Sequence, residues 1–246
     1  MLQIRNLTKQ FGALRVLQPT NLKLEKGQTT VLLGPSGCGK STLLRLIVGL
    51  LPMDSGEILF DGNPLTPENI RDYRRRMGYM IQDGGLFPHL TVRGNAELLA
   101  KRLGWPRDRR EARLRELTEL TDLPHEALDR YPVQISGGQR QRVALIRALF
   151  MDPDVVLLDE PMGALDPLIR SDLQTELKRI FSELQKTVIL VTHDIGEAGY
   201  LGDTIVLFQS GEIIQQGSLE DLVRRPVAPF VSEFINAQRS PLEGVA

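Results

Sequence analysis

"TTVLLGPSGCGKSTLLRLIVGLL", residues 29–51, is the stretch that decides the fold. It opens with a short apolar run, continues through a segment rich in glycine, and ends with apolar residues at helical spacing. A continuous apolar run without polar alternation predicts a strand that is buried on both faces, as in a parallel sheet. The stretch therefore predicts a strand, a loop and a helix in direct succession, and with them a core of mixed α/β class.

The loop in this stretch matches Gly-x4-Gly-Lys-Ser, a pattern that binds phosphate when a strand precedes it and a helix follows it. Glycines reach backbone conformations that other residues avoid, so several N–H groups can face one anion. Lys40 is predicted to reach the β- and γ-phosphates of a nucleotide, and the Ser41 hydroxyl is predicted to bind Mg²⁺. The alternative, a glycine-rich turn without a ligand, leaves the lysine, the serine and the flanking elements unexplained. The predicted nucleotide contacts in the loop are Gly34, Pro35, Ser36, Gly37, Cys38, Gly39, Lys40, Ser41 and Thr42.

Further strands are predicted on both sides of the loop. Residues 75–82, 154–161 and 187–193 are apolar runs of the same buried type. Residues 2–12 and 20–28 instead alternate apolar and polar side chains, which predicts an antiparallel sheet with one face in water. The chain therefore combines an N-terminal antiparallel β region with an α/β core.

Two adjacent acids end one of the apolar runs. The Asp159 carboxylate is predicted to hold the Mg²⁺ shell, as acids at strand ends do in nucleotide hydrolases. Side chains alternate along a strand, so Glu160 is predicted to face an attacking water as the catalytic base. Taken alone, an Asp-Glu pair at a strand end is more often a solvated turn, but the phosphate loop favours the catalytic interpretation.

Three other side chains are candidates for the same site. His193 ends an apolar run, at the sheet edge where ligands bind, and its imidazole is predicted to contact the γ-phosphate or the attacking water. Gln82 is predicted to end another strand and to contact Mg²⁺ or water through its amide. Phe11 is predicted to stack on an adenine ring, although a lone aromatic residue in a strand is more often part of the core.

The character of the chain changes between residues 91 and 130. Strand-like runs vanish, and Leu114, Leu117 and Leu120 stand at helical spacing among charged residues. This pattern predicts a helical subdomain that is inserted into the α/β core.

A long helix and a hairpin are predicted in the last third of the chain. Asp166 and Pro167 suit a helix N-cap and the first helical position. Ser210 and Gly211 suit the turn of a hairpin between two strand-like runs. The helix after Pro167 is expected to present one apolar face, formed by Ile169, Leu173, Leu177, Ile180 and Leu184.

A second possible anion site precedes another helical pattern. Ser136, Gly137, Gly138 and Gln139 stand directly before it, and a helix N-terminus attracts anions. A plain helix cap does not need two glycines, which are unfavourable in helices. One loop already holds one triphosphate, so we expect this second site to contact the γ-phosphate of a nucleotide held by another copy of the chain.

The composition excludes several classes of protein. The chain has 246 residues with a formal net charge of −1, so it lacks the overall positive charge that would attract nucleic acid. Its one cysteine excludes an intrachain disulfide. The N-terminus lacks the apolar run of a signal peptide, and the apolar stretch at residues 43–53 is too short to span a bilayer. If the protein acts at a membrane, we therefore expect it to do so through a partner protein.

These motifs together resemble the ATP-binding subunit of an ABC transporter, over essentially the whole chain. They stand in the family's order: the phosphate loop, the Q-loop glutamine Gln82, the signature at residues 135–139, the acidic strand end, and the switch histidine His193. Between the last two lies the D-loop, Ala164, Leu165 and Asp166, and Asp166 is taken as a nucleotide contact. A kinase or GTPase of the P-loop class would leave the signature unexplained.

The resemblance implies a fold and a domain organisation. We expect a P-loop NTPase with a RecA-like core, an N-terminal antiparallel β subdomain and an inserted helical signature subdomain. The ATPase domain is expected over residues 1–225, the helical subdomain at about 88–150, and a short C-terminal tail at 226–246. Three positions depart from the family pattern: Ile135 for leucine, Phe11 for tyrosine, and Gly163 for the serine of the D-loop, which puts a serine contact across the dimer in doubt.

The resemblance also implies the partners and the activity. We expect ATP and Mg²⁺ as cofactors, a head-to-tail homodimer, separate membrane permease subunits, indirectly a solute-binding protein, and a peripheral location at the cytoplasmic face of the membrane. The permease is expected to dock beside Leu86, Phe87, Pro88 and His89, which follow Gln82. A soluble ABC ATPase that acts on nucleic acid is the alternative, but such relatives usually carry tandem ATPase halves.

A finer resemblance concerns the transported substrate. The segments "IQDGGLFPHLTV", "DEPMGALDPLIR" and "YLGDTIVLF" are similar to importers of glycine betaine, choline and related osmoprotectants. Importers of polar amino acids are the alternative. Many members of the osmoprotectant group carry tandem CBS domains after the ATPase, and regulation through such domains is not expected here.

Overall fold

The computed structural model describes residues 1–163 and 165–238, which form two compact units. The first unit combines Met1–Pro67 with the chain from Ile189 onward, and the second is Glu68–Val188. Each unit contains both strands and helices, as the predicted mixed α/β class requires.

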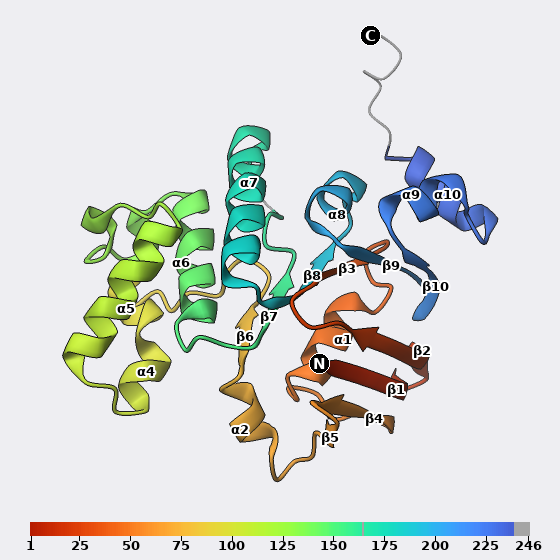
Figure 1. The fold of residues 1–246 in the computed structure, drawn as a ribbon, viewed down its shortest axis with the longest axis horizontal. Helices are drawn as coiled ribbons and strands as arrows, with labels where there is room; N and C mark the ends of the chain where they lie inside the picture. Colours follow the sequence, from red (N-terminus) through yellow and green to blue (C-terminus); the bar gives the residue numbers. More distant parts are fainter. Residues whose placement is uncertain (164, 239–246) are drawn as a thin grey trace, which may run out of the picture. The chain divides into compact units, whose positions relative to one another are not determined.

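The first unit contains an antiparallel sheet of four strands in the order β2-β1-β4-β5, drawn in red and orange in Figure 1. Along β1, buried positions are separated by partly or fully exposed ones, because one face of the sheet packs on the core and the other meets water. The predicted antiparallel region is thus confirmed. Its strands are β1 (Leu2–Phe11), β2 (Leu14–Leu24), β4 (Ser55–Phe60) and β5 (Asn63–Pro64).

The phosphate loop follows a different group of strands in this unit. All five residues of β3 (Thr29–Leu33) are buried, and β3 pairs in parallel with β9 (Thr204–Gln209). The antiparallel partner of β9 is β10 (Glu212–Gly217), and the turn between them has positive φ at Ser210 and Gly211. This confirms both the strand that is buried on two faces and the predicted hairpin.

Among its described residues, the first unit has four helices, α1 (Lys40–Ile47), α8 (Ile195–Leu201), α9 (Leu219–Arg224) and α10 (Pro229–Asn236). The predicted tail at residues 226–246 differs from the structure, because α10 lies within it. Val231 and Ile235 of α10 are buried, and α10 packs against α9. The first part of the tail is therefore an ordered element of the unit, while residues 239–246 lie outside the described chain.

The second unit holds β6 (Met77–Met80) and β7 (Val155–Asp159), which pair in parallel. The strand expected at residues 75–82 is shorter than predicted, so Gln82 does not end it. Gln82 lies in the turn that follows β6. The Gln82 side chain is therefore carried by a loop and not by the strand.

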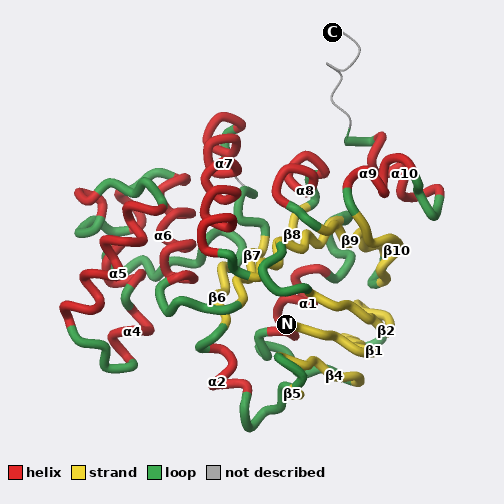
Figure 2. Tube along the Cα trace, in the orientation of Figure 1, coloured by secondary structure: helices red, strands yellow, loops and turns green. Residues whose placement is uncertain are grey.

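Several helices lie in the region of the second unit where a helical subdomain is predicted, about residues 88–150, and that unit also holds its two strands and the long helix α7. Helix α6 packs against α3, α5, α7 and β6, and Leu114 and Leu117 of α5 are buried while Leu120 is half-buried. Figure 2 shows the helices of this region in red. In the described part of the chain, no helix has both the length and the apolar character to cross a membrane. The helices are α2 (Ile70–Arg74), α3 (Val92–Ala96), α4 (Leu98–Arg102), α5 (Arg107–Leu120), α6 (Gly137–Leu149) and α7 (Pro167–Leu184).

The expected apolar face of α7 is only partly buried. Leu173, Leu177 and Ile180 are buried, whereas Leu184 is half-buried and Ile169 is exposed. The helical spacing is therefore as predicted, but its first turn is not part of the core.

A buried carboxylate joins α6 to α7. The Glu176 carboxylate lies 2.9 Å from the Arg142 guanidinium, yet neither carboxyl oxygen makes a hydrogen bond of good geometry within the described chain. Burial raises the pKa of Glu176 to about 7, against the opposing effects of Arg142 and Arg179 and with a further raising effect of Asp122. Native chains therefore hold a proton here at pH values where unfolded chains have released it.

This raised pKa predicts a pH-dependent stability. Between pH 4.5 and about 7, the native state binds more protons at Glu176 than the unfolded state does, so the free energy of unfolding falls as pH rises. Glu176→Gln should remove this dependence on pH. From pH 4.5 to pH 7.5, the free energy of unfolding of the variant should therefore rise by about 1–3 kcal/mol relative to that of the native chain. Urea unfolding at both pH values measures it, and an identical slope in the two proteins would contradict the prediction.

Candidate nucleotide-binding and hydrolysis site

The phosphate loop lies between β3 and α1, and its glycines are required by close contacts. A Cβ atom on Gly34 would lie 2.3 Å from the Phe208 carbonyl oxygen, and one on Gly39 would lie 2.8 Å from that of Val16. Both glycines have positive φ, which other residues rarely adopt. The loop can therefore follow this path only with glycine at these positions.

Lys40 lies inside the loop. Its Nζ donates to the carbonyl oxygens of Gly34 at 2.7 Å and Pro35 at 2.8 Å. The side chain is buried, with the Cys38 Sγ 3.6 Å away. The loop's own carbonyls thus hold one positive charge at the place where the sequence predicts phosphates.

The first turn of α1 suits an anion. Gly39 occupies the N-cap position and makes no side-chain hydrogen bond to the helix, although most helices cap their first N–H groups with a side chain. Pro35, Ser36 and Gly37 are exposed at the tip of the loop. A helix start of this kind, with a lysine beside it, fits the phosphates of a nucleotide.

The hairpin turn between β9 and β10 also holds the loop. The Gly211 N–H donates to the Cys38 carbonyl oxygen at 3.1 Å, and the Gly211 carbonyl accepts from the Gln18 N–H at 3.0 Å. A Cβ atom on Gly211 would lie 2.6 Å from the Val16 carbonyl oxygen. Sequence reasoning predicted the turn but missed this contact, because no local pattern reports what a turn touches.

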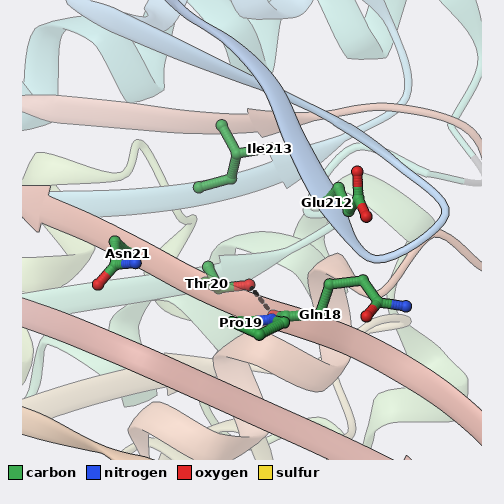
Figure 3. A pocket seen from close by; sticks show the side chains of 6 residues that line it. All are labelled: Gln18, Pro19, Thr20, Asn21, Glu212 and Ile213. Atoms are coloured by element: carbon green, nitrogen blue, oxygen red, sulfur yellow. Dashed lines mark hydrogen bonds between the residues drawn. The ribbon is translucent and has the colours of Figure 1, made fainter.

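An open pocket adjoins this turn. Figure 3 shows side chains from β2 and β10 around it, and it does not include the phosphate loop. No cationic side chain is among its lining residues, so it does not resemble a phosphate site. The lining residues are Gln18, Pro19, Thr20, Asn21, Glu212 and Ile213.

Two more predicted site residues belong to the first unit. His193 directly follows β8 (Thr187–Thr192), the strand beside β3 in the strand order. Phe11 ends β1 and is 46% exposed, so it does not belong to the core. The Lys9 ammonium lies 5.3 Å from its ring centroid. An exposed ring is free to stack on a base, which remains a prediction.

Asp159 and its neighbours lie in the second unit. Asp159 is the last residue of β7 and is buried. The Tyr79 hydroxyl of β6 donates to its Oδ2 at 3.4 Å. Sequence reasoning missed Tyr79; the pairing of β6 with β7 brings the two side chains together.

Glu160 has an unusual backbone conformation. Its φ of 48° lies in the left-handed region, which costs a residue with a side chain about 1 kcal/mol or more and is common at functional sites. The Gly163 N–H donates to its carbonyl at 3.1 Å, and the Gln82 amide donates to its Oε2 at 3.4 Å. The structure thus brings together two residues that the sequence predicted for one site, 78 positions apart.

The Ser136 helix start forms a reciprocal cap. Ser136 Oγ accepts from the Gln139 N–H at 3.2 Å, and Gln139 Oε1 accepts from the Ser136 N–H at 3.0 Å. The Ser-x-x-Gln spacing is a known signal for this capping box, and sequence reasoning did not use it. Gln139 therefore has a structural role in the described chain, and its predicted nucleotide contact is a further role.

The two glycines of this helix start lie against the segment before and within α7. A Cβ atom on Gly138 would approach Ile169 Cγ2 to 2.9 Å, and one on Gly137 would lie 3.4 Å from Leu165 Cδ2. Close packing thus explains Gly138 without any ligand, whereas Gly137 has room for a side chain.

The D-loop residues fall partly outside the description. Asp166 is the N-cap residue of α7, as predicted, but makes no side-chain capping hydrogen bond, and its carboxylate is exposed. Ala164 lies outside the described residues. The nucleotide contact of Asp166 remains a prediction.

The segment after Gln82 is held by two side chains that sequence reasoning missed. Arg147 of α6 donates to the carbonyl oxygens of Gly85 at 2.8 Å and Gly84 at 2.7 Å. The Asn95 amide, which is fully buried, exchanges two hydrogen bonds with the Phe87 backbone at 2.7 and 3.0 Å. This segment therefore has a defined shape, with Phe87 exposed at its surface.

Each unit carries groups that suit a nucleotide phosphate or a metal ion. In the first unit these groups are the loop, Lys40 and the Ser41 hydroxyl, and in the second unit they are the Asp159 carboxylate and the Gln82 amide. Oxygen donors of this kind are the ligands that Mg²⁺ prefers. In the described residues, no group of three or more acidic, histidine or cysteine side chains is placed so that it could hold a metal ion.

A glycine-rich loop with a buried lysine, set between a buried strand and a helix, defines a P-loop nucleotide-binding protein. The chain belongs to the ABC transporter family, because the sequence model of that family matches residues 17–163. The matched range contains the phosphate loop, Gln82, the Ser136 helix start and Glu160. The predicted fold class, an α/β P-loop NTPase, is thereby confirmed.

Several known proteins are similar to the chain. The choline transport ATP-binding protein OpuBA of Bacillus subtilis (strain 168) is 44% identical over 97% of this chain, which spans 63% of that relative's length. The glycine betaine uptake system ATP-binding protein YehX of Escherichia coli (strain K12) is 45% identical over 95% of this chain and 76% of its own length. The sulfate/thiosulfate import ATP-binding protein CysA of Synechococcus elongatus is 45% identical over 95% of this chain and 67% of its own length.

The structural likeness agrees with these relatives. A dimeric structure of the ATP-binding cassette MJ0796, in a post-hydrolysis state bound to ADP and Pi, superposes with a TM-score of 0.80 at 34% identity. The superposition covers 89% of this chain and 99% of that one. Nearly the whole of that cassette thus has its counterpart here.

Proposed function

We propose that the chain is the ATP-hydrolysing subunit of an ABC import system, and that two copies associate head to tail. The observation that carries this proposal is that one chain holds both a phosphate loop around Lys40 and a capped helix start at Ser136. Each of these two sites would meet the other in a second copy. The dimeric state named for the MJ0796 structure supports this arrangement.

The residues then divide the work of hydrolysis. Lys40 and the loop N–H groups bind the phosphates, and Phe11 stacks on the adenine. Ser41, Asp159 and Gln82 would hold Mg²⁺, which when bound would offset negative charge on the phosphates.

Three further groups complete the site. Glu160 takes a proton from the attacking water, and His193 donates a hydrogen bond to the γ-phosphate or orients that water. Residues 136–139 and Asp166 of the second copy contact the nucleotide from the other side.

We propose an osmoprotectant of the glycine betaine, choline or carnitine type as the transported substrate. The names of several relatives support this class, whereas the CysA relative, at similar identity, is named for sulfate and thiosulfate. Polar amino acids and, as a different class of function, work on nucleic acid are the alternatives. Uptake of labelled glycine betaine and sulfate by cells that carry the transporter separates the substrates.

The proposed partners are permease subunits at the cytoplasmic face of the membrane, with a solute-binding protein acting through them. Phe87 is expected to lie in the permease dock, because it is exposed on a segment that Asn95 and Arg147 hold in shape. Phe87→Asp should lower copurification with the permease subunits by about 10-fold or more, the effect expected of a central aromatic contact. Basal ATP hydrolysis should persist.

Val223→Asp is the matched control for this test. Val223 of α9 is 44% exposed and Phe87 is 43% exposed, so both variants place a charge at a similarly open apolar site. Normal permease binding by the Phe87 variant would place the dock elsewhere, and loss with both variants would show that the assay responds to charge alone.

A further inference from the structure

The short segment that carries the exposed His193 is held on both sides by a network of hydrogen bonds in the first unit. His193 stands between the end of β8 and the start of α8. The residues on either side, Thr192 and Asp194, are joined to each other and to Glu197 of α8. The network thus fixes the backbone before and after the imidazole.

Thr192 is the centre of this network. Its hydroxyl donates to Glu197 Oε2, and the same oxygen accepts the Asp194 N–H at 3.1 Å. The Asp194 carboxylate in turn accepts the Glu197 N–H at 3.0 Å. Three bonds therefore close a loop of chain that contains His193.

The burial of these groups argues against a merely exposed turn. Thr192 is 2% and Glu197 is 5% exposed. A buried carboxylate is costly unless hydrogen bonds compensate it, and a buried hydroxyl that both donates and accepts has a fixed orientation. Neither group was among the residues that sequence reasoning selected.

We propose that Thr192 and Glu197 are positioning residues for hydrolysis, which set the place of the His193 imidazole. This inference rests on the proposed role of His193 at the γ-phosphate. Glu197 orients the Thr192 hydroxyl, and that hydroxyl holds the Asp194 N–H and with it the backbone that leaves His193. Positioning matters because small displacements of a reacting group are costly in rate.

Thr192→Val is the direct test, since valine keeps the branched shape and removes only the hydroxyl. We expect kcat for ATP to fall by about 10-fold, while equilibrium binding of ATP stays within about twofold. Thr192→Ser, which keeps the hydroxyl, should restore most of the rate. Steady-state hydrolysis and titration with a fluorescent ATP analogue measure the two effects.

A matched variant controls for the loss of any buried hydroxyl. Thr20 of β2 is also buried, and its hydroxyl donates to the Gln18 carbonyl at 2.7 Å, the bond drawn in Figure 3. Thr20→Val should leave kcat within about twofold. A fall equal to that of Thr192→Val would attribute the effect to general destabilisation and overturn the proposal.

The same substitution in a His193→Ala background separates positioning from other causes. Thr192→Val should lower kcat in both backgrounds, but the fold-decrease should be at least about three times larger in the native background. The His193→Ala protein has no imidazole left to position, so it should lose less. Equal effects in both backgrounds, or none in the native one, would overturn the inference. If His193→Ala alone leaves kcat unchanged, the proposed role of His193 fails first, which is a distinguishable result.

Nuclear magnetic resonance gives a readout that does not depend on turnover. The chain has three histidines, so ring signals can be assigned with His→Ala variants. Thr192→Val should shift the His193 ring signals and leave those of His89 and His125 in place. Unmoved His193 signals would overturn the inference, and this measurement decides if the His193→Ala background turns over too slowly.

Discussion

Glu160→Gln is expected to lower kcat of ATP hydrolysis by about 10²–10⁴-fold, the range for loss of a general base. Glutamine keeps the shape of the side chain but cannot take the proton from water. Glu160 has a left-handed backbone, and the Gln82 amide lies 3.4 Å from its carboxylate. Both features are typical of a side chain with a functional role. Phosphate release under saturating Mg-ATP measures the loss.

The same variant should make the dimer visible. ATP that binds and persists would join the loop of one copy to the Ser136 helix start of the other, and ligand binding to the dimer alone shifts assembly by mass action. The Glu160→Gln protein should therefore run as a dimer with Mg-free ATP and as a monomer with ADP. Light scattering after size exclusion measures both states.

Two kinds of control accompany this prediction. Glu126→Gln removes the same charge from an exposed position of the second unit and should leave both turnover and assembly unchanged. Adding Ser136→Arg to Glu160→Gln should abolish the ATP dimer by filling the anion site. Adding Ser136→Ala, which removes the hydroxyl and with it a cap worth about 1 kcal/mol, should weaken the dimer less. A dimer that survives the arginine would show that Ser136 does not face the partner's phosphate.

Lys40→Ala is expected to weaken ATP binding by about 10- to 100-fold, because a hydrogen bond to a charged group contributes about 1.5–3 kcal/mol. The Lys40 ammonium is buried within the loop and donates hydrogen bonds to its carbonyls. Its removal therefore takes away both a positive charge and two hydrogen bonds that hold the loop in shape. Equilibrium titration with a fluorescent ATP analogue measures the affinity.

Arg45→Ala provides the comparison, since it removes one positive charge from an exposed position of the same helix. Its ATP affinity should stay within about twofold of the native value. If Lys40→Ala binds ATP as tightly as Arg45→Ala does, the assignment of the loop is wrong.

Much of the fold could be predicted because its signals are local. The buried β3, the hairpin at Ser210 and Gly211, and the helix after Ser136 all follow from hydrophobic period and from residues with special backbone preferences. The phosphate loop was readable for the same reason, since its glycines, lysine and serine are contiguous. The strand before Gln82 was predicted too long, because the apolar Ile81 continues the pattern past Met80, where β6 ends.

The contacts that shape the candidate site could not be predicted in this way. Arg147 holds Gly84 and Gly85 from more than sixty positions away, and Gly211 bonds to Cys38 from the other end of its unit's sequence. The left-handed backbone of Glu160 and the hydrogen bonds made by Thr192 and Asp194, on either side of His193, likewise depend on neighbouring residues.

The sequence by itself determined which chemical groups are present and which local elements carry them, because strand, loop and helix starts depend on residues near in the chain. It therefore determined the class of protein and the candidate residues. Only the tertiary structure decided which carbonyls hold Lys40, which amide reaches Glu160, and which hydroxyl fixes the backbone beside His193. The physical reason is that each of these hydrogen bonds requires two groups to meet within about 3.5 Å, and packing of the whole unit sets that distance.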